Sequence, residues 1–113
     1  MMRTRFSVVI TCRNQRSVIS DAIRSALAQT YRAQEVIVVD DASTDGSDVV
    51  VASYGNMVRA VYLKSNQGAA AARNAGAAIA RGDYLAYLDG DDVLKTWALD
   101  VYDQVIRARN PFC

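Results

Sequence analysis

Short apolar runs rich in β-branched residues recur along the chain, at residues 6–12, 35–40, 58–63 and 84–88. Within each run, apolar residues follow one another with little alternation with polar ones. Such continuous runs are typical of parallel strands that are covered on both faces. We therefore predict four buried strands, the last of which, "YLAYL", ends directly before a group of aspartates.

The segments between the runs have a helical period. In residues 17–29 the apolar positions recur as pairs four residues apart, which places them on one face of a helix, and Ser17 is the predicted N-cap. A shorter helix is predicted after Ser47, ending near Gly55. Its predicted contacts are Val49, Val50 and Tyr54.

Two further helices complete the pattern. Residues 68–80 are rich in alanine, the strongest helix former. A last helix is predicted after Thr96, with Pro111 marking its end. Its predicted packed side consists of Leu99, Tyr102, Val105 and Ile106. The alternation of strands and helices predicts right-handed crossovers, a parallel sheet and one α/β domain over residues 1–113.

Polar residues gather directly after the carboxyl end of each predicted strand. They are Thr11, Arg13 and Asn14; Asp40, Asp41, Ser43 and Asp45; Ser65, Asn66, Gln67 and Gly68; and Asp89, Asp91 and Asp92. In open parallel sheets, ligands bind in the crevice outside these strand ends. Any one loop is better explained as a polar cap of its strand, but four such loops together favour a binding site.

The segment Asp89-Gly90-Asp91 is a candidate metal site. Two carboxylates two residues apart on an extended segment point the same way, and Gly90 lets the backbone approach a ligand closely. Carboxylates together with phosphate oxygens are the usual ligands of Mg²⁺, and hard oxygen ligands also suit Mn²⁺. The alternative is a turn rich in aspartate ahead of a helix.

The loop and helix at residues 66–74 form a candidate anion site. A helix that begins near Gly68 directs free N–H groups and a partial positive charge at the crevice. Arg73 could add a charge-assisted contact to a phosphate, or it is a solvated helix arginine. Because the known phosphate-binding fingerprints are absent, the expected ligand is a diphosphate held by a metal ion and this helix N-terminus.

Composition narrows the classes of function. The chain has 13 basic and 12 acidic residues and a net charge of +1, which does not favour nucleic acid or a membrane surface as the main partner. No apolar run approaches the length of a membrane span. There is no histidine, which removes the usual general base and zinc ligand. Cys12 and Cys113 fit no zinc or redox spacing, so a reduced, cytoplasmic chain is expected.

Four ordered segments give the chain a family resemblance. The segments "FSVVITCRN", "EVIVVDDASTDGS", "NQGAAAARNAG" and "GDYLAYLDGDD" resemble the nucleotide-sugar-binding half of family-2 glycosyltransferases over residues 3–106. The resemblance implies the GT-A fold, a three-layer αβα sandwich with a mainly parallel, Rossmann-like sheet. It also implies a site for a UDP-sugar with Mn²⁺ or Mg²⁺.

The resemblance further implies roles for single residues. Asp89 and Asp91 match the D-x-D motif, in which the second aspartate is the metal ligand and the first lies near the ribose and the sugar. Asp41 matches a uracil contact, as does the loop around Thr11, and Arg73 matches an arginine near the nucleotide. The implied donor-binding set is Thr11, Arg13, Asn14, Asp41, Asn66, Gly68, Arg73, Asp89 and Gly90.

The chain departs from the family pattern in two respects. Thr11-Cys12-Arg13-Asn14 stands where the family commonly has Pro-x-Tyr-Asn, so an arginine would have to stack on the base in place of the tyrosine. The chain also ends soon after the D-x-D motif, so the acceptor-binding half and the catalytic base are expected to be missing. A second copy of the chain could cover the open edge of the sheet and supply a missing wall.

Two other functions are weighed against glycosyl transfer. A module that binds a nucleotide or nucleotide sugar without catalysis would show the same strand-end loops. A phosphoacceptor signalling domain would need its acidic pair after the first strand and a lysine after the last, and this order is not found.

Overall fold

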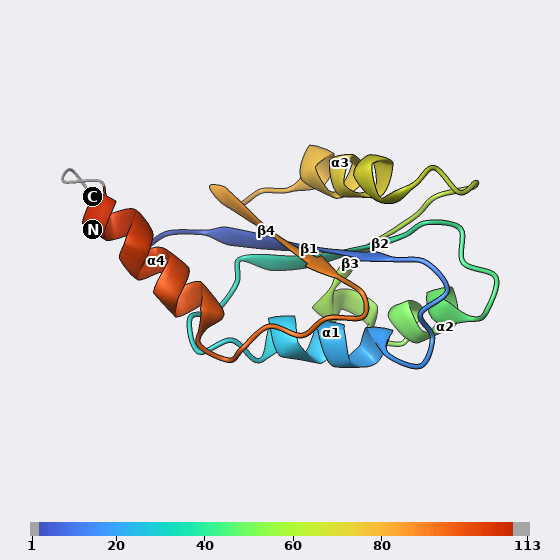
Figure 1. The fold of residues 1–113 in the computed structure, drawn as a ribbon, viewed down its shortest axis with the longest axis horizontal. Helices are drawn as coiled ribbons and strands as arrows, with labels where there is room; N and C mark the ends of the chain where they lie inside the picture. Colours follow the sequence, from blue (N-terminus) through green and yellow to red (C-terminus); the bar gives the residue numbers. More distant parts are fainter. Residues whose placement is uncertain (1–2, 110–113) are drawn as a thin grey trace.

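The structure is a computed structural model that describes residues 3–109, and its centre is a four-stranded sheet (Figure 1). The strands are β1 (Phe6–Cys12), β2 (Glu35–Asp40), β3 (Arg59–Tyr62) and β4 (Tyr84–Asp89). Their order is β3-β2-β1-β4, and every neighbouring pair is parallel. The prediction of four parallel strands is confirmed.

Helices cover both faces of this sheet. They are α1 (Ile19–Leu27), α2 (Ser47–Ala52), α3 (Ala69–Ile79) and α4 (Ala98–Arg109), with a 3-10 turn, η1 (Gly55–Met57). Figure 1 shows α3 on one face and α1 and α2 on the other. Helix α4 extends past the amino end of β1, away from the carboxyl ends of the strands. The three-layer αβα arrangement is confirmed. Within residues 3–109, no helix is long and apolar enough to cross a membrane.

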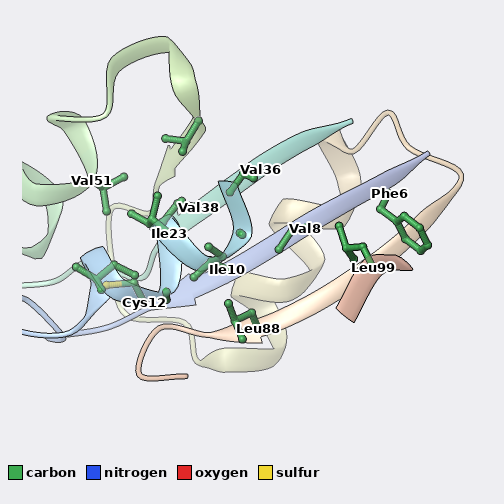
Figure 2. Close-up of a cluster of buried hydrophobic side chains, with 14 residues drawn as sticks. Phe6, Val8, Ile10, Cys12, Ile23, Val36, Val38, Val51, Leu88 and Leu99 are labelled. Atoms are coloured by element: carbon green, nitrogen blue, oxygen red, sulfur yellow. The ribbon is translucent and has the colours of Figure 1, made fainter. Parts of the chain in front are cut away.

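Strand β1 does not alternate between polar and apolar residues, because the core covers both of its faces. All of its residues are buried. Phe6, Val8, Ile10 and Cys12 point into the cluster that includes side chains of α1, as Figure 2 shows, whereas Val9 points into the second cluster with Ile37 and Val39. Both faces are therefore covered, and the strand reads as one apolar run.

Helix α3 lies unusually close to the sheet. A Cβ atom built on Gly76 would lie 2.4 Å from Cγ1 of Val9 and 3.3 Å from Cγ2 of Val39. Ala72, one turn earlier, is fully buried in the same cluster. Small residues on this face let α3 pack on β1 and β2, and this packing fixes where the N-terminus of α3 meets the strand ends.

The prediction that "YLAYL" is a buried strand is wrong. Strand β4 pairs with β1, and no second partner is found for it within the described residues. Only Leu88 is buried, while Tyr84, Leu85 and Tyr87 are 44%, 39% and 48% exposed. The apolar run is therefore an edge of this sheet, and those of its backbone N–H and C=O groups that do not pair with β1 face outward.

Two details of the first helices are also corrected. Ser17 does not cap α1, because the helix begins at Ile19 and the N–H groups of Val18 and Ile19 donate to the carbonyl of Gln15 at 3.0 and 2.8 Å. In α2 the predicted contact Val49 is 70% exposed, whereas the neighbouring Val51 is fully buried. A helix of six residues carries too little periodicity to indicate its buried side.

Helix α4 begins close to where it was predicted, but its packed side is narrower. Leu99 is fully buried and Ile106 packs partly against the core. Tyr102 is 44% exposed, but the centroid of its ring lies 6.4 Å from that of the buried Phe6. Val105 is 49% exposed, so its assignment to the packed side is wrong. Pro111, the predicted end of the helix, lies outside the described residues.

A carboxylate network ties the sheet together at the amino ends of its strands. Glu35 on β2 accepts hydrogen bonds from Oγ of Ser7 at 2.7 Å and from the backbone N–H of Arg81 at 2.5 Å. It also pairs with Nη1 of Arg59 at 2.7 Å, and the same nitrogen donates to the carbonyl of Ile79. Burial raises the pKa of Glu35, but the hydrogen bonds from Ser7, Arg59 and Arg81 outweigh it and hold the pKa below its ordinary value.

We expect Glu35→Gln to lower the free energy of unfolding at pH 7 by about 1 kcal/mol, because neutral hydrogen bonds replace charge-assisted ones. A depressed carboxyl pKa stabilises the fold above the unfolded-state pKa of about 4.3, and this contribution disappears as the pH falls through the folded-state value. The difference between wild type and variant should therefore close on acidification. Urea titrations across pH 3–7 measure it, and a gap that does not depend on pH would contradict the prediction.

Candidate donor-binding site

A cleft of about 230 Å³ lies at the carboxyl ends of the strands. It is lined by Thr11, Cys12, Arg13, Gln15, Asp41, Ala69, Ala72, Asp89 and Asp91. Five of these residues were predicted from the sequence: Thr11, Arg13, Asp41, Asp89 and Asp91. The other predicted residues do not line the cleft, and sequence reasoning missed Cys12, Gln15, Ala69 and Ala72.

Asn14 joins two loops and does not line the cleft. It has a φ of 52°, which asparagine tolerates better than most residues. Its N–H donates to Oγ of Ser43 at 2.9 Å, and its Oδ1 accepts the N–H of Thr44 at 2.8 Å. Asn14 thus holds the loop after β1 against the loop after β2.

Asp41 occupies the entrance to α3. Its side chain is buried, and its Oδ1 and Oδ2 accept the N–H groups of Gln67 and Gly68 at 2.8 and 2.9 Å. Gln67 and Gly68 precede Ala69, the first residue of α3. Asp41 therefore holds the loop that leads into α3, and the anion site at the N-terminus of this helix stays a prediction.

The remaining residues of the α3 loop lie at the margin of the cleft. Gly68 has a φ of 94°, which favours glycine, and Oδ1 of Asn66 accepts its N–H at 3.3 Å. Arg73 follows the cleft residue Ala72 on α3 and is half-buried. Its contact with a phosphate stays a prediction.

Three carboxylates meet at the carboxyl end of β4, beginning with its last residue, Asp89. One oxygen from each of Asp89, Asp91 and Asp92 lies within 4.8 Å of the others, and all three side chains are exposed. The segment is a turn and not the extended chain we predicted, because the N–H of Asp92 donates to the carbonyl of Asp89 at 2.9 Å. The turn brings Asp92 into the group, which alternation along a strand would not have done.

The carboxylate group fits a hard divalent cation. Its ligand atoms are all oxygens, the donor type that Mg²⁺ and Mn²⁺ prefer. None of the ion pairs found in residues 3–109 includes Asp89, Asp91 or Asp92. Three neighbouring negative charges without a basic partner repel one another, and a bound cation would remove this repulsion.

Cys12 lines the cleft but is not a candidate nucleophile. Burial raises the pKa of its thiol to about 11, and the hydrogen bond from Ser47 reverses only part of this shift. The thiol is therefore neutral at physiological pH, and a neutral thiol is a weak nucleophile and metal ligand.

Comparisons with known proteins identify the family of the chain. The family model described as glycosyl transferase family 2 matches residues 7–107. Glycosyltransferase GlyG of Streptococcus pneumoniae is 34% identical over 108 residues, which cover 92% of this chain and 36% of GlyG. The crystal structure of S. aureus TarS 1-349 in complex with UDP-GlcNAc has a TM-score of 0.84 and 28% identity, and the match covers 93% of this chain and 32% of that one.

A second solved structure carries a metal. The mannosyltransferase PcManGT from Pyrobaculum calidifontis, in complex with GDP-Man and Mn²⁺, has a TM-score of 0.77 and 25% identity, covering 97% of this chain and 34% of that one. The chain thus spans about a third of the length of these relatives. With the family model matching nearly all of its residues, the chain belongs to glycosyl transferase family 2.

Proposed function

We propose that the cleft binds the UDP part of a UDP-sugar with the help of Mn²⁺ or Mg²⁺, for transfer of the sugar to an acceptor. The observation that carries the proposal is the lining of the cleft. Asp41, the loop after β1 and two of the carboxylates at the end of β4 all line it. The nucleotide sugar bound to TarS and the Mn²⁺ bound to PcManGT support this assignment.

The base would lie between the loop after β1 and Asp41. The carboxylate of Asp41 uses one lone pair of each oxygen for the backbone of the α3 loop, which leaves further lone pairs for an N–H of uracil. Thr11 would contact the base, and the exposed guanidinium of Arg13 can stack on its ring. Together, Thr11 and Arg13 would take the place of the tyrosine that is common in the family.

The diphosphate would lie beside the carboxylates after β4. Asp91 would hold the metal ion and Asp89 would lie near the ribose and the sugar, with Asp92 close enough to be a further ligand. A bound divalent cation acts as a Lewis acid that stabilises the charge on the leaving diphosphate. The acceptor, the base that deprotonates it and the pairing of two copies through an edge strand of the sheet stay predictions.

Calorimetry of UDP binding tests this proposal. We expect UDP to bind at least about tenfold more tightly in Mn²⁺ than in EDTA, a difference of about 1.4 kcal/mol. Uridine, which lacks the diphosphate, is the matched control and should bind equally in both buffers. Equal affinity of UDP with and without metal would contradict the proposal.

A further inference from the structure

We infer that Gln15 is a positioning residue for the donor, because it sets the place of the Asp89-Gly90-Asp91 turn relative to the nucleotide cleft. No pattern in the amino-acid sequence indicated this role. Gln15 lies at the point where the loops after β1, β2 and β4 meet, and it lines the cleft. The inference rests on the proposed function and adds a residue to it.

The backbone of Gln15 is held on both sides. Its N–H donates to Oγ of Ser47, the buried first residue of α2, at 2.9 Å. Its carbonyl accepts the N–H groups of Val18 and Ile19 at the start of α1. The backbone of Gln15 is therefore fixed to the starts of both α1 and α2, and this fixes where its side chain begins.

The side chain of Gln15 reaches the turn between the two aspartates. A Cβ atom built on Gly90 would lie 2.3 Å from Oε1 of Gln15 and 3.2 Å from its Cδ, so the amide lies directly against Gly90. On the same glycine, the N–H donates to the carbonyl of Thr11 at 2.8 Å. Gly90 is thus enclosed between the end of β1 and the amide of Gln15.

The orientation of the amide is set by the backbone around it. The N–H of Arg13 donates to Oε1 of Gln15 at 3.2 Å, which requires an oxygen at this position. The hydrogen bond that the structure gives the side chain of Gln15 is made by this oxygen. The positioning role therefore depends on the oxygen and on the volume of the side chain.

Loss of this contact should loosen the carboxylates without removing any of them. Metal affinity depends on how well the ligands are held in place, and the loss of an orienting neighbour typically costs about 10- to 100-fold. The base would be bound by the side chains of Asp41, Thr11 and Arg13, and of these Gln15 holds only the backbone N–H of Arg13. The larger part of the effect should therefore fall on the metal-dependent part of the affinity. A residue that only stabilises the fold would lower the melting temperature and leave this part unchanged.

The test compares Gln15→Ala, Gln15→Glu and Gln15→Met by calorimetry with UDP and uridine, in Mn²⁺ and in EDTA. We expect Gln15→Ala to bind UDP in Mn²⁺ about 10- to 100-fold more weakly than wild type. Its affinity for uridine should change by less than about threefold. Gln15→Met keeps the volume without the acceptor oxygen and should lose part of the metal-dependent gain. Gln15→Glu keeps the oxygen and the volume and adds a negative charge beside the carboxylates, so it should bind UDP in Mn²⁺ at least as tightly as wild type.

Gln104→Ala, at an exposed glutamine on α4, is the matched control and should behave as wild type. Equal affinities of wild type and Gln15→Ala for UDP in Mn²⁺ would overturn the inference and leave the proposed function intact. A parallel loss of uridine and UDP affinity would also overturn it, since Gln15 would then support only the base. A wild-type chain without metal-dependent UDP affinity would overturn the proposed function and this inference with it.

Discussion

Asp41→Ala is expected to lower the free energy of unfolding by about 3–6 kcal/mol, the contribution of two hydrogen bonds to a charged group. The N–H groups of Gln67 and Gly68 would lose their buried carboxylate acceptor at the entrance to α3. Because domains of this size are stable by only about 5–15 kcal/mol, much of the chain could unfold. Urea denaturation measures the loss. Asp48→Ala, which removes an exposed aspartate on α2, is the control and should have little effect.

The same carboxylate gives an expected preference among nucleotides. Asp41 can accept the N3–H of uracil, whereas cytosine presents an acceptor at that position. An opposed pair of acceptors costs roughly 1.5–3 kcal/mol, which corresponds to about tenfold to a hundredfold in affinity. We therefore expect UDP to bind more tightly than CDP by this factor in wild type.

Asp41→Asn separates the two roles of this residue. Its amide oxygen can keep one of the two backbone hydrogen bonds, so the fold should lose less stability than in Asp41→Ala. The amide nitrogen can donate to cytosine, and the gap between UDP and CDP should narrow. If CDP or ADP binds wild type as tightly as UDP, the assignment of Asp41 to the base is wrong.

The sequence predicted the sheet and the convergence of its loops because both follow from local pattern. Apolar runs of strand length alternated with helical periods, and each run was followed by polar residues. The carboxyl ends of parallel strands lie at one edge of the sheet, so Thr11, Asp41 and Asp89 had to come together. All three line the cleft.

The exposure of β4 was not predictable in the same way. Its composition matches that of a buried strand, and its burial depends on whether a neighbour lies on its far side. The role of Gln15 and the close packing of Gly76 could not be predicted for a similar reason. Each depends on contacts with segments distant in the sequence, at Gly90 and at Val9, and no spacing along the chain indicates such contacts.

Asp91→Ala is expected to change the stability of the fold in opposite directions with and without metal. In EDTA the variant should be more stable than wild type, because it removes one of three exposed carboxylates that lie within 4.8 Å of one another. With Mn²⁺ and UDP at 100 times Kd, wild type should gain about 2.7 kcal/mol, and the variant should lose most of this gain. Thermal melting in the two buffers measures both changes.

Asp92→Ala separates the loss of charge from the loss of a ligand. It removes one negative charge from the same group, so its stability in EDTA should also rise. The D-x-D pattern places the metal ligand at Asp91, so Asp92→Ala should keep most of the gain from Mn²⁺ and UDP. If the two variants lose the gain equally, the metal is held by the group as a whole. If neither loses it, the carboxylates after β4 do not hold the metal, and the opposite changes expected for Asp91→Ala would not be observed.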